Sequence, residues 1–196
     1  MNQQEARKYY ESNLEDFRYV INFSKPLLEH LLKELKEVNG RAIHDAVKCR
    51  IKELDSTLEK CERRGLEIYE LTDIAGVRII CPFRDDVYKV YDAIRQMPFL
   101  VIKQRKDYIE SPKENGYQSL HLIMEVPIHS TTQRSKVLPM EIQIRTKAMD
   151  LWSSIDHIIK YKNSTPSPEA TEKLRHLADT LEKFETEAIK LRDFSK

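Results

Sequence analysis

The segment KENGYQSLHLIMEV, Lys113–Val126, joins a polar loop to a long apolar run. The apolar run predicts a β-strand, which the chain enters through a glycine followed by a tyrosine. Side chains two residues apart on a strand share a face, so Tyr117, Ser119 and His121 point to one side and the residues between them to the other. We therefore expect one face of this strand to belong to the core and the opposite face to a functional site.

Outward from this strand, helical and extended patterns follow each other along the chain. Apolar or alternating runs predict strands over residues 44–52, 72–83, 99–109, 117–128 and 137–146. Amphipathic spacing predicts helices over residues 55–65, 85–97 and 147–161. Polar segments predict a loop over residues 129–136 and a linker over residues 163–170. The sum is an α/β (α+β) fold with a mixed five-stranded sheet flanked by helices.

Both ends of the chain are predicted to be helical arms. In the first forty residues a leucine stripe predicts a helix that ends at Gly40. Ser24 and Pro26 are expected to begin a second helical piece within this arm. The C-terminal segment carries an apolar stripe that needs a partner surface, formed by Leu174, Leu177, Ala178, Leu181, Phe184, Ala188 and Leu191. The expected units are a helical arm, a central domain, and a linker with an amphipathic helix, over residues 1–40, 41–162 and 163–196.

The composition predicts a soluble globular protein. The 196 residues are 40% hydrophobic and 33% charged, with a formal net charge of +1. No apolar run approaches the roughly 20 residues of a membrane helix, and the N-terminus lacks the apolar segment of a signal peptide, so we expect a cytoplasmic protein without membrane association. Cys49, Cys61 and Cys81 form an odd set without short paired spacing, which argues against a disulfide framework and a structural zinc site.

Two carboxylates on predicted strands suggest a metal site. Asp73 stands before Arg78 on the second strand, and Glu141 shares one face of the last strand with Gln143 and Arg145. A few carboxylates together with phosphate oxygens suit Mg²⁺, so Asp73 and Glu141 are candidate ligands of this cation. The alternative is that each carboxylate pairs with a neighbouring arginine and that the last strand shows a charged face to solvent.

A candidate phosphate site lies at the start of the helix predicted over residues 55–65. Ser56, Lys60 and Arg63 follow one another by about a turn near the free amide groups of the helix N-terminus. Arg50 and Lys52 leave the preceding strand close by. The alternative is an ordinary helix start with solvated charges.

The opening segment suggests a nucleotide-binding loop. Tyr117 can offer its ring for stacking on a base, Lys113 can meet phosphates, and Gly116 lets the loop turn. His121 shares the strand face with Tyr117, which favours a role in binding. The alternative for His121 is a structural histidine with satisfied hydrogen bonds.

Three segments resemble the synthetase domain of the RelA/SpoT family: DIAGVRI, KDYIESPKENGYQSLH and EIQIRTKAMDLWSSIDHIIKY. They occur in this order between about Val47 and Lys162, and the short chain is similar to small alarmone synthetases. The resemblance implies a nucleotidyltransferase-type sheet and transfer of pyrophosphate from ATP to the 3′-hydroxyl of GDP or GTP, which gives (p)ppGpp and AMP. It also implies a homotetramer, and a chain without the metal-dependent hydrolase domain of long family members.

The resemblance also implies roles for individual residues. Asp73 and Glu141 would hold Mg²⁺, and Glu141 would take the proton from the 3′-hydroxyl. The residues implied for ATP are Arg50 and Arg78 at the adenine, and Lys52, Ser56, Lys60 and Arg63 at the phosphates. The residues implied around the acceptor nucleotide are Tyr117, stacked on guanine, and Lys113, Ser119, His121, Gln143 and Arg145. Asp150, where relatives often carry asparagine, would read the N–H edge of guanine.

Two other functions fit many of the same residues. Toxic small alarmone synthetases share the core motifs but pyrophosphorylate the 3′ end of tRNA, and such a protein would have an antitoxin partner. A basic track along an acceptor stem would distinguish them, and KCERR and KQRK are candidate pieces of such a track. A non-catalytic RNA-binding module would use Tyr117 and the strand cations, but would leave the two carboxylates unexplained.

One position departs from the pattern of many relatives. Lys106 in the segment KDYI stands where they carry arginine, as RDYI. The substitution keeps the positive charge but loses the bidentate contact that a guanidinium offers to a phosphate. We expect a weaker phosphate contact at this position.

Overall fold

The computed structural model describes residues 2–98, 100–129, 135–162 and 167–194. The strands are β1 (Ala46–Ile51), β2 (Ala75–Cys81), β3 (Val101–Asp107), β4 (Leu120–Ile128) and β5 (Lys136–Thr146). The helices are α1 (Gln3–Asn39), α2 (Leu54–Arg64), α3 (Arg84–Ile94), α4 (Lys147–Lys162) and α5 (Pro168–Phe194), with a 3₁₀ turn η1 (Ile68–Glu70). No helix within these residues is both long enough and apolar enough to span a membrane.

The strands form one mixed sheet in the order β1-β2-β5-β4-β3. The central strands β2 and β5 run parallel, whereas the other neighbouring pairs are antiparallel. This arrangement confirms the predicted mixed five-stranded sheet. The register sets Gly76 opposite Glu141 and Arg78 opposite Gln143, so polar residues of separate strands meet on one face.

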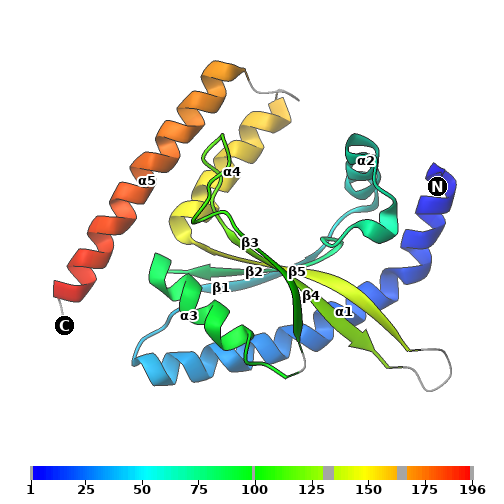
Figure 1. Cartoon of the computed structure of the whole chain (residues 1–196), viewed down its shortest axis with the longest axis horizontal. Coiled ribbons are helices and arrows are strands. Elements are labelled where there is room, and N and C mark those ends of the chain that lie inside the picture. Colours follow the sequence, from blue (N-terminus) through cyan, green and yellow to red (C-terminus); the bar gives the residue numbers. More distant parts are fainter. Residues whose placement is uncertain (1, 99, 130–134, 163–166, 195–196) are drawn as a thin grey trace.

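The two faces of the sheet have different partners. Helices α1 and α3 pack on one face and lie below the sheet in Figure 1, while α2 and α4 rise above it. The face towards α1 carries buried apolar side chains, among them Val77, Leu122 and Ile142, which lie in the same core as Phe17 and Leu28 of α1. The polar positions between them therefore point towards the side of α2 and α4, as the alternation along each strand requires.

Helix α1 is continuous, so the expected second start at Ser24 and Pro26 is wrong. Pro26 lies inside the helix, although an interior proline costs roughly 3 kcal/mol. The helix continues because residues on both sides of the proline, such as Phe17 and Leu32, are buried in the core that α1 forms with the sheet. Gly40 ends α1 with φ 64°, in the left-handed conformation that favours glycine.

Helix α5 packs along α4, away from α1 (Figure 1). Trp152 of α4 donates an indole hydrogen bond to the Leu174 carbonyl at 2.8 Å, and Ala178 lies in the same buried cluster. The helix begins at Pro168, within the predicted linker, because Ser167 caps it by accepting from the Ala170 amide at 3.2 Å. Residues 163–166 of that linker, and 130–134 of the predicted loop, lie outside the described residues.

Candidate active site

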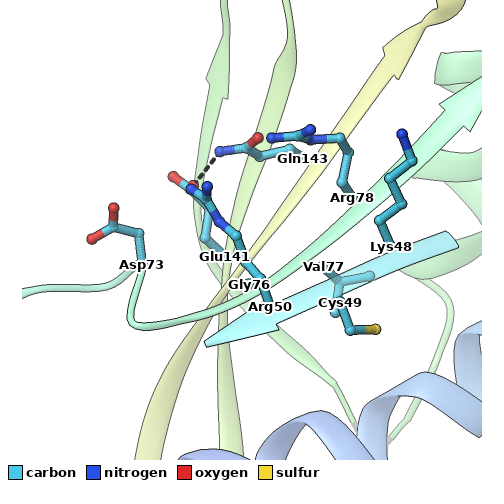
Figure 2. Close-up of a pocket in the computed structure, with 9 residues that line it drawn as sticks. All are labelled: Lys48, Cys49, Arg50, Asp73, Gly76, Val77, Arg78, Glu141 and Gln143. Carbon is cyan, nitrogen blue, oxygen red and sulfur yellow. Dashed lines mark hydrogen bonds between the residues drawn. The ribbon is translucent and has the colours of Figure 1, made fainter. Parts of the chain in front are cut away.

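An open cavity of about 200 Å³ lies on the polar face of the sheet, over β1, β2 and β5. Figure 2 shows the side chains of Lys48, Arg50, Arg78, Glu141 and Gln143 rising from the same side of these strands, with Asp73 on the loop before β2. The guanidinium, ammonium and carboxylate groups that line the cavity suit a charged ligand.

Gly76 leaves the floor of this cavity open. It stands between Arg50 on β1 and Glu141 on β5 in the sheet register. A Cβ atom at this position would already reach ordinary contact with Arg50, at 3.7 Å from its Cγ. Any larger side chain would therefore fill the space between the arginine and the carboxylate.

Asp73 is buried at one end of the cavity between two lysines. Its Oδ2 atom lies 3.0 Å from Lys52 Nζ and 2.7 Å from Lys60 Nζ. Burial raises the pKa of Asp73, but the hydrogen bonds and charges of the two lysines outweigh it and leave the pKa below its ordinary value. The other oxygen, Oδ1, is buried and has no hydrogen-bond partner in the described part of the chain.

Glu141 is held by an imidazole and a primary amide instead. His121 Nδ1 lies 3.0 Å from Oε1, and Gln143 Nε2 donates to Oε2 at 2.6 Å. Burial raises the pKa of Glu141 and the charge of Asp73 adds to that effect, but the hydrogen bond and electrostatic interaction with His121, together with the hydrogen bond from Gln143, outweigh both and lower the pKa. Glu141 is thus a carboxylate at neutral pH, and can accept a proton.

The two carboxylates Asp73 and Glu141 fit the ligand preference of a hard divalent cation. Across the described ranges no three His, Cys, Asp or Glu side chains cluster as a metal site, so two carboxylates are what this cavity offers. Mg²⁺ is commonly bound by one or two carboxylates together with phosphate oxygens and water. The unpartnered Oδ1 of Asp73 supplies a buried acceptor that a cation would satisfy.

A cluster of cations surrounds Asp150 at the other end of the cavity. Asp150 Oδ1 lies 2.7 Å from Arg145 and 3.3 Å from Arg78, and its Oδ2 lies 3.5 Å from Lys48. Arg145 is 2% exposed and also donates to Ser153 at 2.7 Å. Burial, with the charge of Arg78, lowers the pKa of Arg145 to about 10. A single carboxylate among three cations leaves this end of the cavity positively charged, which favours anionic ligands.

The loop before β4 brings an aromatic group to the same face. The Tyr117 ring forms edge contacts with Tyr108, His121 and Trp152 at centroid distances of 5.9, 5.8 and 6.1 Å. Lys113 Nζ lies 4.8 Å from the Tyr117 ring centroid. The tyrosine is thus half-buried in an aromatic group, with a cation beside it.

Comparisons with known proteins show the family of this chain. The model of the region found in RelA/SpoT proteins matches residues 49–166. The GTP pyrophosphokinase YwaC of Bacillus subtilis is 42% identical over 154 residues, which cover 75% of this chain and 73% of that protein. The chain belongs to the RelA/SpoT family. The GTP pyrophosphokinase YjbM of Bacillus subtilis is 33% identical over 190 residues, covering 94% of this chain and 89% of that protein.

A solved structure of a small RelA/SpoT protein agrees with the fold along almost the whole chain. Small alarmone synthetase 1 of Bacillus subtilis, bound to its product pppGpp, superposes with a TM-score of 0.87 at 30% identity, covering 95% of this chain and 97% of that one. The resemblance inferred from the three sequence segments is therefore confirmed for family and fold.

The structure brings most of the residues expected from the RelA/SpoT resemblance to one face. Among the predicted site residues, those lining the cavity are Arg50, Asp73, Arg78, Glu141 and Gln143. Lys52 and Lys60 contact Asp73 of the cavity lining, and His121 contacts Glu141 of the lining. Ser56 and Arg63 are exposed on α2, while Lys113 is exposed beside the tyrosines. Ser119 is buried and donates to the Ile144 carbonyl, and Asp150 is engaged by cations.

Four residues that line the cavity were not among the predicted site residues: Lys48, Cys49, Gly76 and Val77. Lys48 lies one alternation before Arg50 on β1, so the period of the strand already gave its direction. Gly76 had no sequence signal beyond its occurrence inside an apolar strand, where a glycine often marks a close approach. Only the sheet register places it opposite Glu141.

Proposed function

We propose that this chain is a (p)ppGpp synthetase, which transfers pyrophosphate from ATP to the 3′-hydroxyl of GDP or GTP and releases AMP. The observation that carries the proposal is the cavity that joins two depressed-pKa carboxylates to guanidinium and ammonium groups. It is supported by the relatives named GTP pyrophosphokinases and by the pppGpp-bound neighbour. The synthetase domain would span residues 41–162.

In the proposed reaction, the acceptor 3′-oxygen attacks the β-phosphorus of ATP. The bond from that phosphorus to the oxygen shared with the α-phosphate breaks, AMP leaves with the electron pair, and the 3′-hydroxyl proton goes to Glu141. The lowered pKa of Glu141 keeps it ionised and ready to accept this proton. Because the protein forms no covalent bond to substrate, its contribution is positioning and charge stabilisation.

The cations divide between the two substrates in this proposal. Arg50 and Arg78, on neighbouring strands, would clasp the adenine, and Lys52 and Lys60 would meet the ATP phosphates. The remaining residues proposed for ATP are Ser56 and Arg63 on α2. Tyr117 would stack on guanine, and the other groups proposed near the acceptor are Lys113, Ser119, His121, Gln143, Arg145 and Asp150.

Asp73 and Glu141 would hold Mg²⁺, the cation that suits their oxygen ligands. When bound, the metal would neutralise charge on the transferred phosphoryl group. With Mg²⁺ present, Asp73 would exchange part of its pairing with Lys52 and Lys60, which frees these lysines for phosphates.

The test is the product formed by the purified chain with Mg²⁺ and ATP labelled at the β- or γ-phosphate. GDP, GTP and deacylated tRNA are offered separately as acceptors. We expect label in ppGpp or pppGpp together with stoichiometric AMP. Label in tRNA alone would show a toxin-type acceptor instead, and the absence of label from all acceptors would contradict pyrophosphate transfer.

A further inference from the structure

Three site residues form a continuous hydrogen-bonded chain. The Tyr117 hydroxyl lies 2.8 Å from His121 Nε2, and His121 Nδ1 lies 3.0 Å from Glu141 Oε1. His121 is 8% exposed, so both ring nitrogens are engaged within the protein. These two hydrogen bonds connect the loop before β4 to a carboxylate on β5.

The chemistry of Glu141 fixes the direction of its hydrogen bond with His121. An ionised carboxylate only accepts, so His121 Nδ1 must carry the proton that it shares with Glu141. In a neutral ring Nε2 then accepts from the Tyr117 hydroxyl, and in an imidazolium it donates to the hydroxyl oxygen; Nδ1 donates to Glu141 in both forms. The tyrosine thereby favours the tautomer in which His121 can donate to Glu141.

The second oxygen of Glu141 is fixed as well. Gln143 donates to Oε2 from two residues further along β5, and His121 stands directly opposite Gln143 in the β4–β5 register. Donors from two strands therefore hold both oxygens of a side chain that otherwise rotates about three bonds. Each oxygen keeps a free lone pair for a proton or a cation.

We propose that His121 is a positioning residue that orients the Glu141 carboxylate for proton acceptance and is itself held in the required tautomer by the Tyr117 hydroxyl. This role rests on the proposed function. It assigns His121 mainly to the orientation of Glu141, and not to direct contact with the acceptor. Loss of such a supporting partner typically costs about 10–100-fold in activity, because the carboxylate is present but misaligned.

Two amide substitutions test the roles of the two ring nitrogens of His121 separately. His121→Asn keeps a donor near the position of Nδ1, towards Glu141, whereas His121→Gln places its amide near Nε2, towards Tyr117. We expect His121→Gln to lower kcat roughly 10–100-fold with near-constant KM for both substrates, and His121→Asn to recover most of that loss. Tyr117→Phe should lower kcat less than His121→Gln. His30→Gln is the matched control, since it changes an exposed His–Glu pair on α1.

A measurement without turnover accompanies the kinetics. Nitrogen-15 shifts of His121 in the resting protein are expected to show a proton on Nδ1. An unprotonated Nδ1, equal kcat losses in the Asn and Gln variants, or a loss confined to the acceptor KM would each overturn the positioning role alone. A wild-type chain that forms no pyrophosphorylated product would instead overturn the proposed function and the positioning role with it.

Discussion

The two site carboxylates differ in what holds them. Asp73 lies against two ammonium groups, whereas Glu141 accepts from an imidazole and a primary amide. Phosphates entering the site would compete more strongly for the charged lysines of Asp73 than for the imidazole and amide donors of Glu141. Asp73 therefore suits a role that changes when the nucleotide binds, and Glu141 suits one that requires a constant orientation.

The first prediction concerns this pair. Asp73→Asn and Glu141→Gln should each lower kcat by about 100-fold or more, because each removes a charge from the proposed Mg²⁺ site, and such a metal supplies several kcal/mol of stabilisation. Turnover with ATP and GDP across a range of Mg²⁺ concentrations checks this. Circular dichroism should show an unchanged fold, and full activity in either variant at ordinary Mg²⁺ would disprove the assignment.

The second prediction concerns Tyr117. Tyr117→Ala should weaken guanine nucleotide binding by about 1–3 kcal/mol, the usual worth of a base–aromatic stack, and leave ATP binding nearly unchanged. The ring also contacts Trp152, so the melting temperature is measured alongside separate affinities for the two nucleotides. Equal losses for both nucleotides in a destabilised protein would identify the ring as a packing residue.

At the scale of elements, α5 supports the loop that carries Tyr117. Gly116 precedes the tyrosine with φ +87°, and a Cβ there would lie 2.7 Å from Ala178 Cβ on α5. Gln118, on the other side of Tyr117, accepts from Arg84 and donates to Glu182 of α5. The loop is thus shaped by a helix far away in sequence, and the glycine is needed for a close approach as well as for the turn.

The third prediction separates these two demands on Gly116. Gly116→Ala should lower stability more than Gly40→Ala, because both positions have positive φ but nothing lies within 4 Å of a Cβ at Gly40. Positive φ alone costs about 1–3 kcal/mol for a residue with a side chain, and the contact with Ala178 adds to it. Urea unfolding of both variants checks this, and Gly116→Ala should also raise the acceptor KM. Equal stability losses would mean that the contact with α5 is unimportant.

The fourth prediction uses Glu185 of α5, a buried carboxylate with an unpartnered Oε1 among the described atoms. Burial raises its pKa above the ordinary 4.5, and the interactions with Thr146 and Arg84 only partly offset this. Since the unfolded chain loses this proton first, the carboxylate lowers stability as pH rises through 4.5 and the folded-state pKa. Glu185→Gln should therefore raise Tm at pH 8 more than at pH 4. An equal change in Tm at both values would contradict it.

At the scale of the molecule, α5 has an inner and an outer face. Leu174 and Ala178 are buried within the chain, whereas Phe184 is 69% and Phe194 is 90% exposed. The predicted stripe is therefore only partly covered by α4. The outer face of α5 still exposes apolar side chains that a partner would cover. That this partner is a second copy of the chain remains a prediction.

The fifth prediction tests the oligomer. The intact chain should give a light-scattering mass above that of the 23.2 kDa monomer, and Phe184→Ser should reduce it. The reason is that an exposed phenylalanine loses its contribution to an interface when it becomes polar. Lys183→Ser, next to it on the helix, is the control. A monomeric mass for the intact chain would rule out the subunit interface, leaving another protein, such as an antitoxin, as the partner to seek.

The sequence by itself determined the order of helices and strands, the alternation that separates the two faces of the sheet, and the family. These follow from local periodicity and from short motifs, which depend on neighbouring residues alone. It failed at Pro26, where a local breaking signal predicted a second helical start. There the core contacts of residues on either side outweighed the cost of the proline.

The tertiary structure alone decided how the site residues engage one another. The sequence did not say that Lys52 and Lys60 share Asp73, that Asp150 is engaged by Arg145, or that His121 bridges Tyr117 and Glu141. Such pairings depend on strand order and register. These are set by burial of apolar side chains across the whole sheet, at positions far from the polar residues they bring together.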